Sequence, residues 1–270
     1  METIRYYFTL AKMFFFMNLK SSASYYGWSF LGVYIAHVLG YIASYITIWG
    51  AMRSFDGLMG WSMSAVMFIY SIDLFSYALA QMFVQVFWRT DELIGRGRLD
   101  DFLLRPVDSF AHLVLHKVEF GYLAHISVAL AALIFAIFIS PVAWTGIMVF
   151  ALVITLIAAT LLQIVFGSLP ACAAFWFINS ENFTAFVRWG SRTFIQYPII
   201  IYPAAIRFFI SFIIPMAFVN YYPSLVMLGK AEGIWIYGPL ISLAIAIILM
   251  IVTVRTWHFC VRHYSSSGSG

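Results

Sequence analysis

Charged side chains are scarce in this chain: Lys, Arg, Asp and Glu together make up only 10% of its 270 residues. Hydrophobic residues account for 63% of the sequence and aromatic residues for 19%. A soluble domain of this length cannot bury so much apolar side chain, so most of the chain must have lipid as its solvent. The composition therefore excludes a soluble globular protein, and a net charge of +4 from scattered basic residues does not indicate a nucleic-acid partner.

Cysteine is also scarce, and Cys172 and Cys260 lie far apart in apolar surroundings. Two distant cysteines form neither a disulfide framework nor a zinc-binding CxxC pair, so we expect free, buried thiols. The N-terminus lacks a small-residue cleavage site, and Lys12 and Lys20 interrupt its apolar run, which argues against a cleaved signal peptide. Residues 261–270, which end in SSSGSG, are expected to form a flexible tail.

Long uncharged runs, separated by short polar or proline-containing segments, dominate the rest of the sequence. They predict an all-α integral membrane protein, because a helix of about 20 apolar residues satisfies its own backbone across a bilayer. A single transmembrane domain of six helices is expected over residues 23–260. The predicted spans cover about 25–51, 61–88, 110–139, 144–176, 182–202 and 234–257.

The first 22 residues carry a polar stripe within an apolar background. Glu2, Arg5, Thr9 and Lys12 recur at spacings of three and four, which places them on one face of a helix. Such a helix lies in the membrane interface rather than across the bilayer. We therefore expect residues 1–22 to form an interfacial amphipathic helix.

Prolines interrupt the apolar segment that precedes the last span. Pro198, Pro203, Pro215 and Pro223 cannot share one straight helix, because each lacks a backbone donor and clashes with the preceding turn. We expect residues 203–229, which contain the last three of these prolines, to form a re-entrant helical hairpin on the outer side. Such broken backbone is tolerated at membrane depth only against protein or a water-filled cavity.

The basic residues are distributed unevenly between the two sides of this predicted topology. With the N-terminus inside, twelve Lys and Arg face the cytoplasm, and only Arg53, Arg207 and Lys230 face the outer side. Cytoplasmic segments of membrane proteins carry the excess of Lys and Arg. Both termini and the segment 89–108 are therefore expected in the cytoplasm.

The segment 89–108, RTDELIGRGRLDDFLLRPVD, holds nine of the chain's 26 charged residues. It is expected to form two short helices, the first capped by Thr90 and ended by the glycines at 95 and 97, the second capped by Asp100 or Asp101. An ordinary solvated loop needs no apolar cluster such as Leu99, Phe102, Leu103 and Leu104 among its charges. A docking site for a soluble partner is therefore favoured over a simple connector.

The run GRLD at 97–100, followed by FLLRPV at 102–107, resembles the G-x-L-D-x-L-L-x-P stretch of type-2 ATP-binding-cassette (ABC) permeases. The residues GWS at 60–62 and the proline-spaced segment at 197–223 also resemble the small six-span bacterial subfamily. The resemblance covers nearly the whole chain. It implies a permease subunit in the bacterial cytoplasmic membrane, with a proline-rich hairpin on the outer side.

In that family the loop after the second span is a coupling helix that sits in a cleft of a cytoplasmic ATPase. The resemblance thus implies two ATPase copies, a second permease chain, identical or paralogous, and export of an unidentified substrate. The chain has no Walker A motif, so ATP and Mg²⁺ are expected on the partner and the chain is not expected to be an enzyme by itself. The residues expected to couple to the ATPase are Asp91, Glu92, Gly97, Arg98, Leu99, Asp100, Phe102, Leu103, Leu104, Arg105 and Pro106.

Four polar residues recur every four positions in the second predicted span: Asp73, Tyr77, Gln81 and Gln85. This spacing places them on one face of a helix. A carboxylate inside a membrane is costly and usually faces protein or water. Two interpretations stay open: the face lines a transport pathway or subunit interface, or it makes structural hydrogen bonds between helices.

Asp108, His112, His116 and Glu119 share a helical face at the start of the third predicted span. Two histidines four residues apart, together with a carboxylate, can hold a metal ion. No HExxH arrangement is present, however, so an interfacial polar stripe is favoured over a metal site.

The sequence therefore predicts the permease subunit of an ABC exporter, which forms its pathway as a dimer and is driven by separate ATPase subunits. The alternative is an ion- or proton-coupled secondary transporter or channel that uses Asp73. An intramembrane metalloenzyme that uses His112, His116 and Glu119 is a further, less favoured alternative. The abundance of aromatic residues favours an amphipathic or apolar substrate, such as a drug, a lipid-linked molecule or a peptide.

Overall fold

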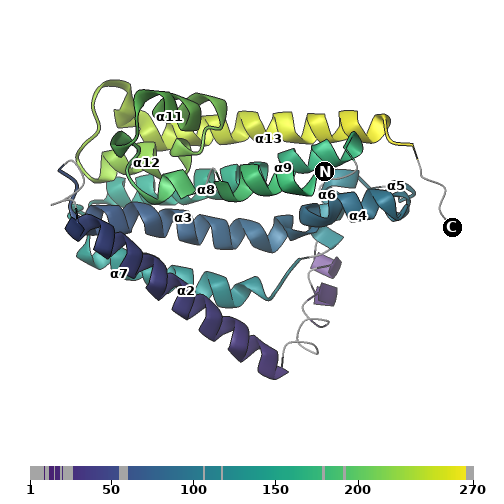
Figure 1. Cartoon of the computed structure of the whole chain (residues 1–270), viewed down its shortest axis with the longest axis horizontal. Coiled ribbons are helices and arrows are strands. Elements are labelled where there is room, and N and C mark those ends of the chain that lie inside the picture. Colours follow the sequence, from purple (N-terminus) through teal and green to yellow (C-terminus); the bar gives the residue numbers. More distant parts are fainter. Residues whose placement is uncertain are drawn as a thin grey trace.

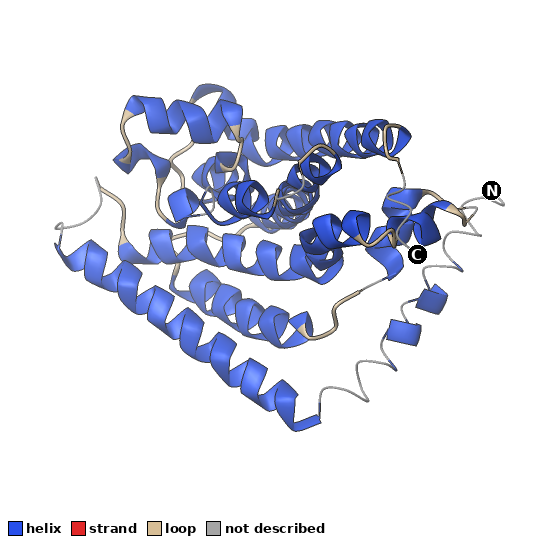
Figure 2. Ribbon diagram, turned by 45° about the vertical axis from the view of Figure 1, so that its right-hand side comes forward, coloured by secondary structure: helices blue, strands red, loops and turns tan. Residues whose placement is uncertain are grey.

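The computed structural model describes most of the chain, and every regular element in the described part is helical (Figures 1 and 2). The predicted interfacial helix and the end of the predicted tail lie largely outside the described residues. The described residues are 9, 12–14, 16–18, 20, 27–54, 60–105, 107–116, 118–177, 180–190 and 193–265.

Five helical stretches in the described part are long and apolar enough to cross a membrane, or six if one bent helix pair counts as a span. This architecture confirms the predicted all-α integral membrane fold. The five stretches contain α2 (Gly27–Ser54), α3 (Met63–Val84), α7 (Tyr122–Ile139), α8 (Gly146–Ser168) and α13 (Gly238–Arg262).

Helix α3 lies at the centre of the bundle, between α7 and α8 (Figure 1). In the 18-residue stretch of highest hydropathy, 72% of the residues are buried for the span that contains α3, whereas 11% are buried for the span that contains α2. Helix α2 leans against α7 at the edge of the bundle, as Figure 2 also shows. The main core joins α3 and α8 to α13 and to α12 (Ala217–Met227). The polar face predicted on the second span therefore lies on the most enclosed helix.

Local sequence signals explain where several helices begin and end. Ser62 caps α3 by accepting a hydrogen bond from the backbone N–H of Ala65 at 3.2 Å, and Thr145 caps α8 in the same way. Helix α7 ends before the Ser140-Pro141 pair, as predicted. Near Pro170 the α8 helix tightens into a 3-10 segment, η2 (Leu169–Phe175).

The second and third predicted spans have different limits in the structure. The helical path of α3 continues through the 3-10 segment η1 (Gln85–Arg89) into α4 (Thr90–Gly95), so the second span runs directly into the charged segment. The third span begins only at Tyr122, because a separate short helix, α6 (Ser109–His116), precedes it.

The fifth predicted span, over 182–202, is not one helix in the described residues. The extended backbone at Pro198 and the preceding irregular turns divide it. Its segments are α9 (Glu181–Ala185), the π-helical turn η3 (Phe186–Gly190), η4 (Phe194–Gln196) and η5 (Ile199–Ile201).

The predicted helical hairpin is present between this divided segment and the last span. Its first arm consists of α11 (Ala204–Phe208) and the π-helical η6 (Phe209–Ile213), and its second arm is α12. The arms meet at an angle of 104°. Pro203 precedes the first arm and Pro215 lies at the bend, whereas Pro223 lies inside α12. A 3-10 segment, η7 (Gly233–Tyr237), then leads into α13, which continues to Arg262.

Candidate functional site

The charged segment folds as two short helices joined by a tight turn, and we call residues 90–105 the knob. Helix α4 ends at Gly95, and α5 (Leu99–Leu103) begins after three intervening residues. The N–H of Gly97 donates to the carbonyl of Ile94 at 3.1 Å, and the N–H of Asp100 donates to the carbonyl of Gly97 at 3.2 Å. Gly97 adopts φ +65°, a conformation that favours glycine. The break predicted at the glycines is thus confirmed.

The inner side of the knob is apolar and buried. Leu99 is fully buried and Phe102 is 8% exposed. Both belong to a cluster that includes Phe87 of η1, Cys172 of η2 and Trp257 of α13. Three membrane-crossing segments therefore converge on the apolar side of the knob. Both cysteines of the chain are free and buried in this cluster, as predicted.

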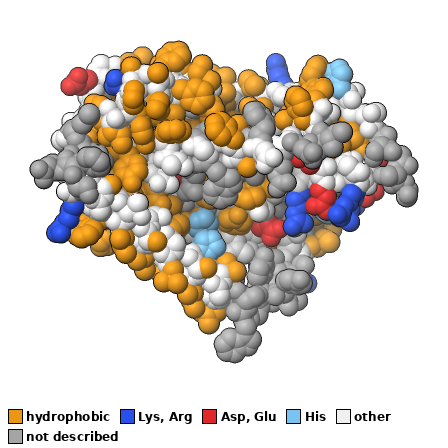
Figure 3. Space-filling view, in the orientation of Figure 1, with side chains coloured by type: hydrophobic (Ala, Val, Ile, Leu, Met, Phe, Trp, Pro, Cys, Tyr) orange, Lys and Arg blue, Asp and Glu red, His pale blue; other side chains and the backbone are white. Residues whose placement is uncertain are grey.

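The outer side of the knob is charged and exposed. Its exposed side chains include Arg96, Arg98, Asp101 and Arg105, and Figure 3 shows charged side chains gathered at this end of the molecule. Arg96 forms an ion pair with Glu92 at 2.8 Å within α4. The apolar side chain of Leu104 is 83% exposed, at the end of α5. Of the predicted coupling residues, Pro106 lies outside the described residues.

Hydrogen bonds in the knob differ from those predicted at its helix caps. Thr90 is buried and donates to a backbone carbonyl one turn earlier at 2.9 Å, so it does not cap α4. Asp91 accepts a hydrogen bond from the hydroxyl of Ser180 at 2.5 Å, which ties α4 to the segment before α9. Asp100 and Asp101 lie in the first turn of α5 rather than at its N-cap. In the first turn, their negative charges still interact favourably with the helix dipole.

The polar face predicted on the second span is buried along α3 and half-buried in η1. Asp73 is fully buried, and its Oδ1 accepts a hydrogen bond from Nε2 of Gln163 on α8 at 2.8 Å. Tyr77 and Gln81 are also buried. Gln85 is half-buried and accepts a hydrogen bond from the hydroxyl of Tyr122 at 3.0 Å. The pathway role of this face stays a prediction.

The predicted histidine stripe separates into two contacts. Asp108 caps α6 by accepting from the N–H of Ala111 at 2.9 Å, and its other oxygen contacts Nε2 of His258 at 2.5 Å. His112 and His116 lie instead against the ring of Phe102, with centroid distances of 4.9 and 5.0 Å. Within the described part of the chain, no group of three or more His, Cys, Asp or Glu could hold a metal ion.

The structure also brings together two histidines that showed no pattern in the sequence. His37 of α2 and His125 of α7 lie with ring centroids 4.4 Å apart. They line a cavity of about 400 Å³ together with Tyr41, Tyr77 and Tyr122. No periodicity could link them, because they lie on different helices. Gln163, the buried partner of Asp73, could have been noticed in the sequence, since it is the sole amide side chain in the apolar run 144–176.

A multi-pass helical bundle with a charged knob at one end defines an integral membrane protein. A family model described as ABC-2 family transporter protein matches residues 38–268, which include the knob, the hairpin and most of the bundle. The chain therefore belongs to the ABC-2 transporter family and is the permease of an ABC system. Comparisons with curated proteins and with solved structures returned no match.

Family membership also explains why the chain can lack ATPase chemistry. An ABC-2 permease is the membrane component of its transporter and is not itself catalytic. It implies a partnership with an ABC ATPase. The resemblance to type-2 ABC permeases that was noted in the sequence is thereby confirmed.

Proposed function

We propose that this chain is the transmembrane subunit of an ABC exporter, and that two permease chains form the pathway at their interface. Two cytoplasmic ATPases, which hold ATP and Mg²⁺, dock on the two knobs. Closure of the ATPase dimer then moves the knobs as rigid bodies and switches access across the membrane. The proposed location is the bacterial cytoplasmic membrane, with both termini and the knob in the cytoplasm, on the basis of the distribution of Lys and Arg.

The observation that carries this proposal is the continuous helical path from the membrane core to the knob. Helices α3 and α4, joined by η1, form one apolar helical stretch from Met63 to Gly95. The path contains Asp73 and ends one residue before the turn of the knob. A displacement of α4 must therefore move α3, because no flexible linker separates them.

The apolar side of the knob extends this coupling to other spans. Leu99 and Phe102 pack in the same cluster as Trp257 of α13 and Cys172 of η2. The indole N–H of Trp257 donates to Ser109 of α6 at 3.2 Å, which holds the cluster from behind. Close-packed side chains transmit displacement because they have few voids to absorb it.

The outer side of the knob has the chemistry of a docking surface. Leu104 follows α5 and is 83% exposed, and the exposed charges of Asp101 and Arg105 lie within three residues of it in the sequence. A buried apolar anchor with a charged rim is the usual anatomy of a protein interface. These features support insertion of the knob into a cleft of the ATPase.

The exposed face of α2 supports a second permease chain. Large apolar side chains recur there at spacings of three and four residues, on a helix whose main contacts in the described part of the chain are with α7 and α3. Such a stripe suits contact with lipid or van der Waals packing against a second helix in the membrane. Its members are Leu31, Ile35, Leu39, Ile42 and Ile46.

The two alternative functions have less support. A secondary transporter would need Asp73 to exchange an ion, but its side chain is fully buried between α3 and α8 and bonded to Gln163. A metalloenzyme would need His112, His116 and Glu119 to converge, and the described residues contain no such metal-binding group.

Co-expression with a candidate ABC ATPase from the same genome tests the proposal. Charge reversal by Arg98→Glu and Arg105→Glu, or Leu104→Asp, is expected to abolish co-purification and transport while the permease remains folded. Arg262→Glu is the matched control, because Arg262 is an exposed arginine at the same end of the molecule (Figure 1). Equal ATPase recovery with all four variants would refute docking on the knob.

A further inference from the structure

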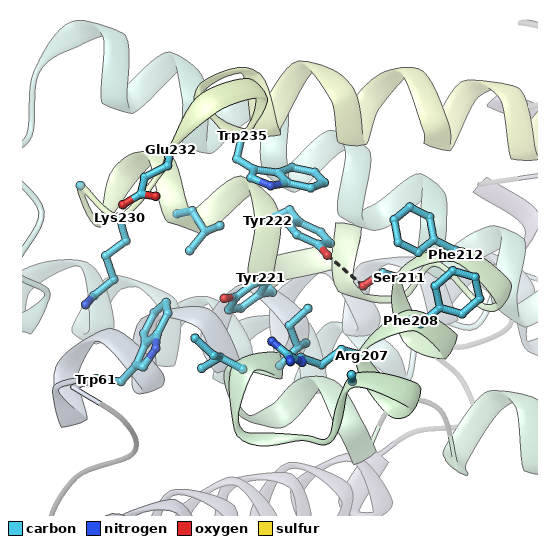
Figure 4. A pocket seen from close by; sticks show the side chains of 15 residues that line it. Trp61, Arg207, Phe208, Ser211, Phe212, Tyr221, Tyr222, Lys230, Glu232 and Trp235 are labelled. Carbon is cyan, nitrogen blue, oxygen red and sulfur yellow. Dashed lines mark hydrogen bonds between the residues drawn. The ribbon is translucent and has the colours of Figure 1, made fainter.

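A second site lies at the end of the bundle opposite the knob. A cavity of about 710 Å³ opens there between the two arms of the hairpin, η7 and the start of α3 (Figure 4). Trp61 precedes α3, Arg207 lies on α11, and Trp235 lies on η7. These segments are distant in sequence, so the cavity exists only in the folded chain.

Aromatic rings form much of the wall of this cavity. Tyr222 and Trp235 are stacked, with centroids 4.0 Å apart and planes at 15°. Trp61 contacts Tyr221 with centroids 5.8 Å apart. The hydroxyl groups of Tyr222 and Ser211 lie 2.9 Å apart, which fixes the ring of Tyr222 between the two arms of the hairpin.

The wall is held rigidly by a close backbone contact at Gly238. A Cβ added to this glycine would lie 2.6 Å from the carbonyl oxygen of Tyr222. The start of α13 therefore lies directly against α12, and η7 is carried with it. The stacked pair Tyr222 and Trp235 is thus preformed rather than assembled by a ligand.

Two cations and one carboxylate face the cavity. The ammonium group of Lys230 lies 4.9 Å from the ring centroid of Trp61 and donates to the carbonyl of Gly60 at 3.4 Å. Arg207 is exposed and forms no ion pair within the described part of the chain. Figure 4 places Glu232 beside Lys230 at one end, with Arg207 nearer the centre. The cavity therefore has a net charge of +1 and an arginine that is available to an anion.

The loop that carries Lys230 is shaped by two glycines. Gly229 has φ +64° and Gly233 has φ +57°, both in the region that favours glycine. The N–H of Lys230 donates to the carbonyl of Leu225 at 2.8 Å, which fixes the loop to the end of α12. This backbone geometry holds Lys230 and Glu232 at the mouth of the cavity.

The opposite end of the cavity is apolar. Phe208 and Phe212 project from the first arm of the hairpin with ring centroids 5.2 Å apart. They are 58% and 62% exposed, so their rings are available to hydrocarbon. In Figure 4 they lie on the side away from Lys230 and Glu232. One end of the cavity thus suits charge and the other suits an acyl or prenyl chain.

We propose that this cavity binds an amphiphile with an anionic headgroup, a phosphate or carboxylate attached to a hydrocarbon chain. Arg207 and Lys230 contact the anion, the rings of Tyr222 and Trp235 pack beside the headgroup, and Phe208 and Phe212 contact the chain. Arginine is suited to this role because its planar guanidinium can donate two parallel hydrogen bonds to a phosphate or carboxylate. The site belongs to this chain alone, so it does not depend on the proposed ATPase partner.

Native mass spectrometry of the purified full chain tests the proposal with three probes. They are phosphatidylglycerol, which is an anionic lipid, phosphatidylcholine, which is zwitterionic, and glycerol phosphate, which has the anion without the hydrocarbon. We expect phosphatidylglycerol to bind most tightly. Arg207→Gln and Lys230→Gln should each weaken it about tenfold, the cost of one charge-assisted hydrogen bond. Glu232→Gln should strengthen it, because that substitution removes the carboxylate that repels the headgroup.

Arg53→Gln is the matched control for these substitutions. Arg53 is also an exposed cation over an indole ring, 4.4 Å from the centroid of Trp49, but it does not line the cavity. Retention of phosphatidylglycerol should be unchanged in this variant. Equal losses in Arg53→Gln and Arg207→Gln would mean that general surface charge binds the lipid, and the proposal would be overturned.

The chain-contacting end has its own test. Phe208→Ala with Phe212→Ala should weaken phosphatidylglycerol binding and leave any weak glycerol phosphate binding unchanged. If glycerol phosphate binds as tightly as the lipid, the cavity recognises a soluble anion and not an amphiphile. If phosphatidylcholine binds as tightly as phosphatidylglycerol in every variant, the two cations do not select the headgroup.

Discussion

Gln163 on α8 donates a hydrogen bond from Nε2 to Oδ1 of Asp73 on α3 at 2.8 Å, and both side chains are buried. The two residues are 90 positions apart and join the two most extensively packed spans of the core. A carboxylate at this depth is tolerated because polar groups of neighbouring helices satisfy it. The contact makes Asp73 a feature of helix packing as well as a candidate for transport.

Gln163→Leu is expected to destabilise the protein by about 1–3 kcal/mol, because it deprives a buried carboxylate of a donor. The double variant Asp73→Leu with Gln163→Leu should lose less than the sum of the two single variants, since no unpaired charge remains. Unfolding of each variant in mixed detergent, analysed as a double-mutant cycle, measures the coupling. Additive losses would show that the hydrogen bond contributes nothing.

Asp73→Asn is expected to lower transport while the ATPase still docks. The amide keeps nearly the same shape and can still accept from Gln163, but it removes the negative charge of the carboxylate. Transport in reconstituted vesicles and ATPase recovery measure the two effects separately. Unchanged transport would leave Asp73 with a structural role only.

Gly97→Ala is expected to weaken ATPase docking through backbone strain of about 1–2 kcal/mol at its positive φ. Space is not the limitation, because an added Cβ would meet only Asp100, at 3.9 Å. Gly95→Ala is the matched control, since Gly95 lies in α4 without a positive φ and has nothing within 4 Å of an added Cβ. Equal docking by the two alanine variants would contradict the role of the turn.

Gly167→Ala is expected to destabilise the protein by about 1–3 kcal/mol through overpacking. Its Cβ would lie 2.6 Å from Cγ2 of Val84, where α8 crosses the end of α3. Adding Val84→Ala should restore stability, because the obstructing atoms belong to a side chain. Gly238→Ala should not be rescued in this way, since its Cβ meets the backbone of Tyr222. Thermal unfolding of the single and double variants distinguishes the two cases.

The packing of α6 against the knob should lose stability in mild acid because of His112. Burial lowers the pKa of His112 below its usual value; the backbone of Phe102 opposes this in part, and the charge of Arg105 adds to it. The unfolded chain therefore binds the proton first, so stability falls as the pH drops below about 6.5, the ordinary pKa of histidine, and levels off below the folded pKa. His112→Phe should keep the packing against Phe102 and flatten this dependence. Melting temperatures between pH 5 and 8 check both statements, and a slope shared by wild type and variant would exclude His112.

Much of the fold follows from local properties of the sequence. Each long apolar run predicts its own span, and Pro141, Pro203 and Pro215 mark breaks that the structure confirms. The knob was predicted from its charges and from Gly97. Helix limits were less accurate: 182–202 was predicted as a single span, because its composition is apolar and only the packed backbone reveals the separate turns.

The candidate site was predicted less completely, because residue spacing shows which side chains share a face and not what that face meets. Spacing placed His112 in a stripe with Asp108, but α13 supplies His258 as the partner of Asp108 instead. The cap predicted at Thr90 was wrong for a local reason, since its hydroxyl donates to the carbonyl of Phe87 one turn earlier.

The sequence by itself determined that this chain resides in a membrane, that its charged segment protrudes from the bundle, and that it resembles an ABC permease. These conclusions depend on length, hydrophobicity and local motifs, which do not change with packing. Only the tertiary structure decided that α3 runs unbroken into the knob, that Gln163 meets Asp73, and that Arg207 and Lys230 face one aromatic cavity. Such pairings depend on how whole helices pack, because side chains far apart in sequence meet only where complementary surfaces bury each other.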